Sequence, residues 1–426
     1  MDPELGRVIG RSLLLDLSPL RESRDFRLLW MSQLTTVTGR QFVLVAVPYQ
    51  IYVLTHSSLA VGLLGVFQAA PIVVTGLYSG ALADRFDRRR LQLVGKSVAA
   101  AGSLALAAGA GTLHAPVAFF YAVVVVTSAA STLDQSARAA TVPRLVPRHL
   151  LPSAMSLSQV MLQSAAIVGP ALAGLAIASV GVSWAFVFDA AGCLPAAALV
   201  SRLSPQPPPE GHGVVLGWGA PAQAIAYVRR NRLVIGLFSA DLVAMIFGMP
   251  SALFPALALS VFGIGARGLG LLYAAPAAGA LVGSLLSGWV RQVSRQGMAV
   301  LFAVAIWGGA IAGFGIAGRT LWLGLPLLAV AGAGDLVSAI FRNTILQLTV
   351  PDSIRGRMSA FHQMVVTTGP RLGDLEAGAV AALAGPLFSV VSGGFACVVG
   401  IALVAVLVPE MRRQRAPREM GHLPAA

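Results

Sequence analysis

The chain has 426 residues, of which 56% are hydrophobic and only 11% are charged, and its mean hydropathy is +0.79. Because a soluble domain carries roughly 25% charged residues, this composition excludes an ordinary soluble protein and predicts an integral membrane protein. The formal net charge of +13 would suggest nucleic-acid binding in a soluble chain. Here the arginines lie in short loops between apolar segments, which is how membrane proteins set their orientation, so we expect no nucleic-acid partner.

Twelve apolar segments are long enough to cross a hydrocarbon core, which takes roughly 20 helical residues. They begin near Leu28, Ala60, Leu91, Pro116, Ser153, Trp184, Leu233, Leu269, Met298, Leu321, Met358 and Pro386. Before the first of them, the leucine run at 13–15 is too short for a secretory signal and is followed by no cleavage pattern. We therefore expect residues 1–26 to form a cytoplasmic tail.

The connections between these segments alternate in charge. One side carries repeated arginine clusters, whereas the other carries almost only Arg267 and Arg319. The arginine-rich side is cytoplasmic by the positive-inside rule. Both termini are then cytoplasmic, the number of spans is even, and we expect a multi-pass protein of the cytoplasmic membrane.

A linker divides the chain into two halves of six spans. Residues 204–213 form a Pro- and Gly-rich run that cannot be a buried helix. We expect bundles at 27–202 and 233–410, a cytoplasmic linker at 203–232, and a cytoplasmic tail at 411–426. Within the linker, Trp218, Ala222, Ile225 and Arg229 recur at helical spacing, which favours an interfacial helix over a merely basic loop.

The two halves resemble each other in sequence. The matching pairs are Gly62-Leu63-Leu64 with Gly270-Leu271-Leu272, Ser79-Gly80 with Ser287-Gly288, Arg138 with Arg342, and Val146-Pro147 with Val350-Pro351. Their shared order indicates an internal repeat. We therefore predict an all-α membrane fold of two pseudo-symmetric six-helix bundles, which is the architecture of an alternating-access transporter.

The segment at 80–89, Gly-Ala-Leu-Ala-Asp-Arg-Phe-Asp-Arg-Arg, resembles the signature between the second and third helices of the major facilitator superfamily. The segments at 46–50, 254–258, 270–275 and 356–358 are similar to the enterobactin exporter branch of that superfamily. The resemblance covers nearly the whole chain. It implies a twelve-helix major facilitator fold and the proton-driven export of a siderophore or another bulky metabolite, whereas composition and spacing alone indicate only a transporter.

The resemblance also implies a conformational latch on the cytoplasmic side. In the family, the acid of the signature faces the start of the eleventh helix, and an arginine pairs with an acid at the end of the fourth. The corresponding residues here are Gly80, Asp84, Arg85, Arg88, Arg89 and Asp134. The alternative is that the arginines serve topology alone. The second half has Gln292 and Gln296 in place of the latch charges, so we expect no second latch.

Polar and charged residues inside the spans are candidates for the substrate or proton pathway, because burying one charge costs roughly 2.5 to 3.5 kcal/mol. The candidates are Arg40, Gln41, Asp241, Asp335, Asp374 and Glu376. The spacing places Asp335 on one helical face with Arg342, and Arg371 beside Asp374, where we expect structural pairing. Asp241 and Asp335 are the preferred proton carriers, Asp335 first. We expect His362 to be an interfacial polar residue, with a role in proton transfer as the alternative, and Asp189 to be a helix-end or packing residue.

Nothing in the chain points to an enzyme. It has no Walker A loop, and Cys193 and Cys397 lie in apolar segments without metal-ligand spacing, so we expect no metal and no cofactor. The leading hypothesis is a monomeric proton antiporter in the lipid bilayer that exports a siderophore-like small molecule. A broad drug or macrolide efflux pump of the same fold, and a membrane sensor or scaffold that no longer transports, stay open as alternatives.

Overall fold

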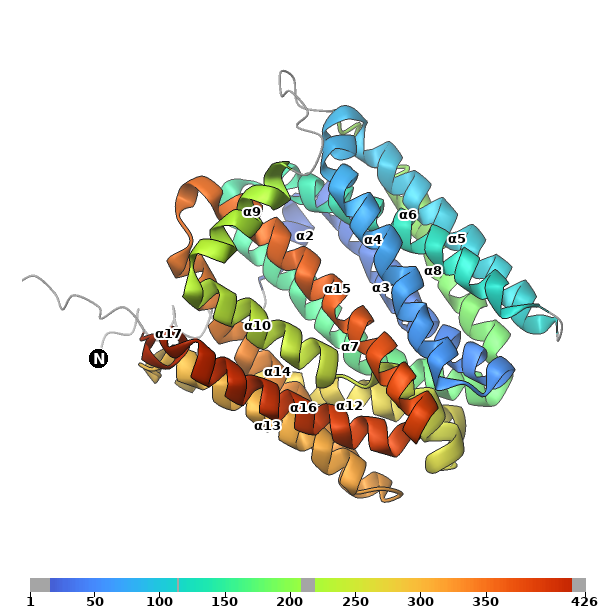
Figure 1. Cartoon of the computed structure of the whole chain (residues 1–426). Helices are drawn as coiled ribbons and strands as arrows, with labels where there is room; N and C mark the ends of the chain where they lie inside the picture. The colour runs from blue at the N-terminus through green and yellow to red at the C-terminus, as the bar shows by residue number, and fades with distance from the viewer. Residues whose placement is uncertain (1–15, 113–114, 208–218, 416–426) are drawn as a thin grey trace, which may run out of the picture. The chain divides into compact units, whose positions relative to one another are not determined.

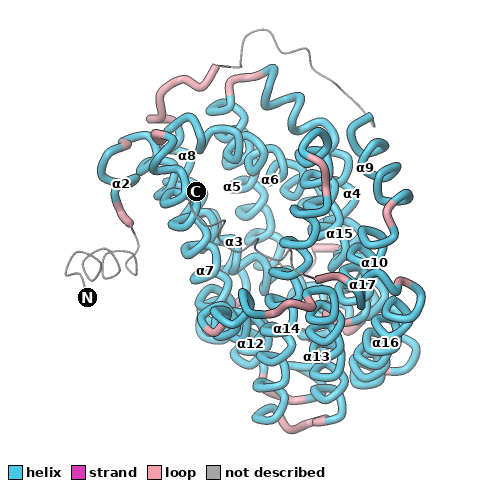
Figure 2. Tube along the Cα trace, turned by 90° about the vertical axis from the view of Figure 1, so that its left-hand side faces the viewer, coloured by secondary structure: helices cyan, strands magenta, loops and turns pink. Residues whose placement is uncertain are grey.

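A computed structural model describes residues 16–112, 115–207 and 219–415 (Figure 1). These residues form helices and connecting loops, and no strand occurs among them (Figure 2). Twelve long helical segments begin within a few residues of the twelve predicted starts, which confirms the predicted all-helical membrane fold. The predicted tail residues 1–15 and 416–426, and the linker residues 208–218 including Trp218, lie outside the described residues.

The long helices of the first half are α3 (Arg24–Thr55), α4 (Ser58–Arg85), α5 (Arg88–Gly111), α6 (Val117–Leu145), α7 (Leu151–Val180) and α8 (Val182–Val200). Those of the second half are α10 (Arg232–Phe247), α12 (Gly265–Leu285), α13 (Gln296–Ile316), α14 (Leu321–Thr349), α15 (Asp352–Ala384) and α16 (Pro386–Leu407). The short helical elements are α2 (Ser18–Glu22), η1 (Arg148–Leu150), α9 (Gly219–Arg230), η2 (Ser251–Leu253), α11 (Phe254–Ala256), η3 (Leu257–Val261), η4 (Ser287–Gln292) and α17 (Pro409–Arg413).

Short polar residues cap the helices that open each half. Ser23 accepts a hydrogen bond from the Phe26 amide at the start of α3, and Asn231 accepts one from the Val234 amide at the start of α10. Such caps satisfy backbone amides that have no partner within the helix. Ser23 and Asn231 are separated along the chain by the same interval as Gly62 and Gly270, so the internal repeat extends to its capping residues. Helix α9 lies within the segment for which the linker helix was predicted.

The described chain forms two compact units. The first contains most of the N-terminal half together with residues 264–274, and the second contains most of the C-terminal half together with residues 57–66. In the first unit α5 packs against α6 and α8, which run beside it in Figure 1, and in the second α13 packs against α14 and α16. The third helix of each half therefore has the same two neighbours, the fourth and the sixth, as expected for a structural repeat.

Glycines allow the repeated segments to make close backbone contacts. In the second unit, a Cβ atom on Gly62 of α4 would lie 2.5 Å from the Asp374 carbonyl oxygen and 3.1 Å from the Gly378 Cα of α15. In the first unit, a Cβ atom on Gly270 of α12 would lie 2.6 Å from the Pro170 carbonyl oxygen and 3.1 Å from the Gly174 Cα of α7. Each glycine of the matched sequence pair thus faces a glycine on another helix, and no side chain fits at either position.

The seventh span is discontinuous. Helix α10 ends at Phe247, Gly248 to Pro250 break the helix, and the span resumes with η2, α11 and the π-helical segment η3. Trp307 of α13 donates a hydrogen bond from its indole nitrogen to the Gly248 carbonyl oxygen, at 2.7 Å. This bond satisfies one of the backbone groups that the break leaves open, which matters because an unsatisfied group is costly inside a membrane.

Ten helical segments among the described residues are apolar and long enough to cross a membrane. The two long helices that do not meet this criterion are α3 and α15. Helix α3 carries Arg40 and Gln41 near its middle, and α15 carries Arg371, Asp374 and Glu376 in its second half. These residues make α3 and α15 the two polar helices of the set. Charged residues in spans usually face protein or a water-filled path and not lipid.

Candidate functional site

The most deeply buried ion pair in the described chain joins Asp241 of α10 to Arg342 of α14. The Arg342 Nη2 atom lies 2.9 Å from Asp241 Oδ1, and the two side chains are 5% and 2% exposed. Helix α10 is otherwise apolar around Asp241, with Gly236, Leu237 and Ala244 buried on it. A buried carboxylate requires such a compensating charge, because removing it from water without a partner costs several kcal/mol.

Arg342 has further polar neighbours on its own helix. Its Nη1 atom donates a hydrogen bond to Ser338 Oγ at 2.7 Å, and its Nη2 atom also lies 3.7 Å from Asp335 Oδ1. The spacing of Asp335 and Arg342 predicted that they share a face, and this ion pair confirms it. Asp335 is 42% exposed, so Arg342 connects one buried carboxylate with one that is partly open.

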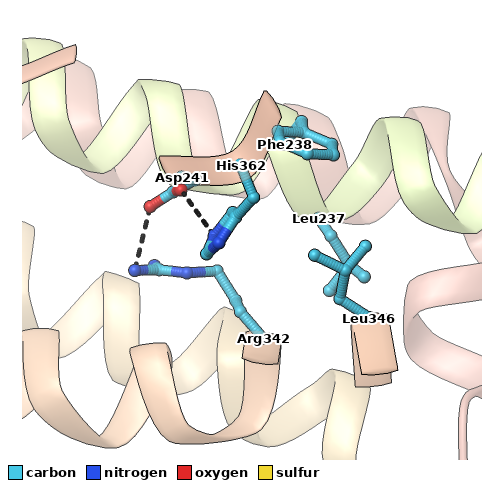
Figure 3. Close-up of a pocket in the computed structure, with 6 residues that line it drawn as sticks. All are labelled: Leu237, Phe238, Asp241, Arg342, Leu346 and His362. Carbon is cyan, nitrogen blue, oxygen red and sulfur yellow. Dashed lines mark ion pairs between the residues drawn. The ribbon is translucent and has the colours of Figure 1, made fainter. Parts of the chain in front are cut away.

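His362 of α15 is the third residue at Asp241, with its Nε2 atom 3.7 Å from Asp241 Oδ2. The sequence predicted an interfacial polar residue at His362 and did not identify Asp241 as its partner. In Figure 3 the side chains of His362 and Arg342 approach the Asp241 carboxylate from different helices. The sequence held one signal for it, a lone histidine within a span, but not the partner.

Asp241, Arg342 and His362 line a small pocket. Its other lining residues are Leu237, Phe238 and Leu346 (Figure 3). Its cavity volume is about 10 Å³, close to the roughly 10 to 15 Å³ that one water molecule requires, whereas pockets for drug-sized ligands usually occupy roughly 300 to 1,000 Å³. The pocket therefore suits protons and water better than a bulky metabolite. We refer to Asp241, Asp335, Arg342 and His362 as the charge cluster.

A second buried carboxylate, Asp374 of α15, holds the break in the seventh span. Its Oδ1 atom accepts hydrogen bonds from Ser251 Oγ at 2.5 Å and from the Ala252 amide at 3.0 Å, at the start of η2. Arg371 Nη1 lies 3.6 Å from Asp374 Oδ2, which confirms the predicted contact between these two residues. Every oxygen of this carboxylate thus has a partner, which is the arrangement of a structural group. Glu376, two residues further along α15, is half-buried.

In the first unit, Asp134 of α6 pairs with Lys96 of α5. The Lys96 Nζ atom is 3.3 Å from Asp134 Oδ2 and 3.5 Å from Thr36 Oγ1, and Lys96 is 2% exposed. The resemblance implied an arginine of the 80–89 segment as the partner of Asp134, whereas this ion pair is made by a lysine. Lys96 lies two turns inside α5.

Two other polar residues of the first unit differ in their surroundings. Asp189 of α8 is buried, accepts a short hydrogen bond from Ser103, and lies against Gly39 of α3, so it occupies the packing position expected for it. Arg40 is exposed on α3, while the neighbouring Gln41 packs closely against Gly169 of α7. Arg40 is therefore the more accessible of the two pathway candidates on that helix.

Two arginines of the 80–89 segment contact backbone carbonyl groups within the first unit. Arg88 is 6% exposed and donates from Nη1 to the Ala140 carbonyl oxygen at 2.9 Å, and Arg89 donates to the Ser201 carbonyl oxygen. Arg85 lies over the ring of Phe86, 5.9 Å from its centroid. The contacts of Gly80 and the side chain of Asp84 lie outside the described part of the structure.

Comparison with known proteins places this geometry in context. The family model described as a transmembrane secretion effector matches residues 15–425. The enterobactin exporter EntS of Citrobacter koseri is 29% identical over 96% of this chain and 97% of its own length. The enterobactin exporter EntS of Salmonella typhi is 28% identical over 95% and 97%.

Solved structures show the same fold. A crystal structure of a POT family transporter in complex with 5-aminolevulinic acid superposes with a TM-score of 0.72 at 12% identity, covering 91% of this chain and 97% of that one. A bacterial homologue of the human lysosomal transporter Spinster gives 0.72 at 16% identity, covering 93% and 100%. At such identities the likeness carries the fold alone.

Proposed function

Because the chain belongs to the transmembrane secretion effector family of major facilitator transporters, we propose that it is a secondary active exporter that exchanges protons for a siderophore-like metabolite. The family consists of transporters, so the chain is a multi-pass membrane transporter and not an enzyme. The identity of the cargo and its coupling to protons are the parts we propose.

The relatives support a siderophore-like cargo. Two enterobactin exporters are similar to this chain over nearly the full length of both proteins. Arg40, exposed on the polar helix α3, offers a positive charge to an anionic, catecholate-type ligand. We propose that Arg40 and Gln41 contribute to the substrate path, as Glu376 does on α15.

The burial of Asp241 beside Arg342 is the observation that supports the proposal of proton coupling. The Asp241 carboxylate is 2% exposed and is paired with one guanidinium. When a proton is taken up beside it, the charge of that proton can compensate the carboxylate in place of the guanidinium, and Asp241 changes its partner. The pocket beside it is too small for the cargo, so loading and unloading of the cargo can alter proton access without competing for the same space. We propose that Asp241 is the principal carboxylate and that Asp335 assists it.

Transport by the purified protein in liposomes tests this function. We expect efflux of preloaded enterobactin to accelerate when the outside medium is made more acidic than the interior, because proton entry then drives export. Macrolides and other drugs added as competitors should slow this efflux less than a second catecholate siderophore does. Efflux that ignores the pH gradient would contradict proton coupling, stronger competition by macrolides would favour a drug pump, and no transport at all would favour a sensor or scaffold.

The latch is a further part of the proposal. We propose that Asp84 stabilises the state closed to the cytoplasm, together with Gly80, Arg85, Arg88, Arg89 and Asp134. We also propose that both termini are cytoplasmic and that the monomer is the transporting unit. The family resemblance supports the role of Asp84, whose charge would face the amides at the start of the eleventh helix, where negative charge is favoured.

Asp84→Asn is therefore expected to slow enterobactin efflux by roughly fivefold or more, the usual size of a coupling between conformational states. Membrane insertion should be unchanged, because the substitution removes a charge and no volume. Efflux from liposomes and the amount of protein in the membrane are the measurements. Glu22→Gln, at an exposed acid on α2, is the control, and efflux equal to that of the unmodified protein would remove Asp84 from the latch.

A further inference from the structure

His362 is the titratable member of the charge cluster to which the proposed function gives no role. It lies on α15, whereas the two charged groups that face it come from other helices: Asp241 from α10 and Arg342 from α14. On its own helix the nearest acid or base towards the C-terminal end is Arg371, about 13 Å further along at the rise of an α-helix. Towards the N-terminal end, Arg357 bonds Gln223 of α9.

His362 and Asp241 lie close together but do not form a hydrogen bond. Its 3.7 Å separation is longer than a hydrogen bond, which joins nitrogen and oxygen at about 2.7 to 3.2 Å. Asp241 Oδ2 is buried and accepts no hydrogen bond, whereas Oδ1 is in the ion pair with Arg342 Nη2; the Arg342 Nε atom is likewise buried without an acceptor. Unsatisfied buried polar atoms are uncommon and usually have a functional reason. Here they leave Asp241 Oδ2 open to a donor from the direction of His362.

The charge of the cluster is one proton short of neutral. With both carboxylates ionised, Asp241 and Asp335 contribute two negative charges, Arg342 contributes one positive charge, and a neutral imidazole adds none. Asp335 is 42% exposed, so water can solvate its charge, whereas Asp241 depends on protein groups. One additional proton beside Asp241 would balance the cluster, and the imidazole is the neutral base in contact with it.

His362 is also in a position to receive a proton. Its side chain is 18% exposed and lines the pocket that reaches Asp241. The ring of Phe238 meets it edge-on, with centroids 5.8 Å apart at 70°, which limits how the imidazole can turn. The residue is thus open to the pocket while its ring is held facing the carboxylate.

We propose that His362 accepts the coupling proton and then replaces Arg342 as the partner of Asp241, an inference that rests on the proton antiport proposed above. Protonation makes both ring nitrogens donors, so Nε2 donates to Asp241 Oδ2 whichever nitrogen held the proton before. The 3.7 Å gap closes, and Arg342 turns to Asp335 and Ser338 on its own helix. Release of the proton restores the pair between Arg342 and Asp241, and one proton is carried in each cycle.

Two substitutions at His362 test this. His362→Gln keeps a polar group that can donate a hydrogen bond but cannot take up a proton, and His362→Lys supplies a charge independently of the gradient. We expect both variants to lose the acceleration of enterobactin efflux by an acidic exterior by about tenfold or more. Exchange of internal for external enterobactin at equal pH should stay within about twofold of the unmodified protein, because exchange needs no net proton transfer. His149→Gln, at an exposed histidine in η1, is the matched control and should leave both activities unchanged.

The outcomes separate this inference from the proposed function. If Asp241→Asn loses the response to the pH gradient while His362→Gln keeps it, proton antiport stands and His362 is not the acceptor. If both variants keep the response, proton coupling through the cluster fails. Loss of exchange together with gradient-driven export in both His362 variants would assign His362 a packing role and would also overturn the inference.

Discussion

Asp241→Asn is expected to abolish gradient-driven export of enterobactin while leaving exchange at equal pH. The amide has the shape of the carboxylate but carries no charge, so it cannot supply the negative charge with which the coupling proton pairs. Arg342 keeps Asp335 as a partner, 3.7 Å away, so its guanidinium is not left without an acid. We expect the acceleration by an acidic exterior to fall by about tenfold or more, measured as the ratio of efflux rates with and without the gradient.

The matched control is Asp352→Asn. Asp352 lies at the start of α15, is 86% exposed and is paired with Arg355 on the same helix, so its neutralisation should change neither activity. Asp335→Asn should reduce the response less than Asp241→Asn does, because Asp335 is the more exposed and more distant partner of Arg342. A full response to the gradient in Asp241→Asn would contradict its role, and a larger loss in Asp335→Asn would return that role to Asp335.

Hydropathy predicted most of the helices because the requirement for a span is local: a span needs its own run of apolar residues. The polar helices α3 and α15 are the two long helices that do not meet this criterion. Contacts within one helix were predictable for the same reason. The spacing of Asp335 and Arg342, and that of Arg371 and Asp374, follows from the period of an α-helix, and the structure contains both ion pairs.

Contacts between helices were not predictable from one sequence. Asp241, Arg342 and His362 come from three helices, and nothing in their spacing specifies that these helices bring them together. The expectation therefore ranked Asp335 first among the carriers, using the only partner visible from its own helix. The partner of Asp134 was missed for the same reason, since Lys96 belongs to a neighbouring helix.

The break in the seventh span had a visible signal. Gly248-Met249-Pro250 combines a flexible residue with one that removes a backbone donor, within an apolar run long enough to cross the membrane. What the sequence did not indicate is how the break is stabilised. Asp374 of α15 and Trp307 of α13 satisfy the backbone on its two sides, and both belong to other helices.

Arg342→Met is expected to have the largest effect on stability. Asp241 is 2% exposed and its Oδ2 atom accepts no hydrogen bond in the structure, so loss of the guanidinium leaves a buried negative charge without its main partner. Removing one member of a buried ion pair typically costs about 3 to 5 kcal/mol. We expect a lower midpoint of thermal unfolding in detergent and a lower yield of folded protein.

Arg138→Met is the control from the other half, because Arg138 is the sequence counterpart of Arg342. The acid one turn away from it, Asp134, keeps Lys96 as its partner at 3.3 Å, so this substitution leaves no buried acid alone. A smaller loss of thermal stability is expected than for Arg342→Met. Equal losses would mean that the guanidinium contributes through packing and not through its pair with Asp241.

The double variant Asp241→Asn with Arg342→Met separates the cost of an isolated charge from the value of the pair. Replacing both members of a buried ion pair by neutral groups is often close to neutral for stability, so most of the thermal stability lost in Arg342→Met should return. The response of efflux to the pH gradient should not return, because the Asp241 carboxylate that pairs with the coupling proton is absent. A folded but uncoupled double variant would indicate that the pair is retained for coupling, since stability alone would not require it. If stability fails to recover, the cost of Arg342→Met does not come from the unpaired Asp241.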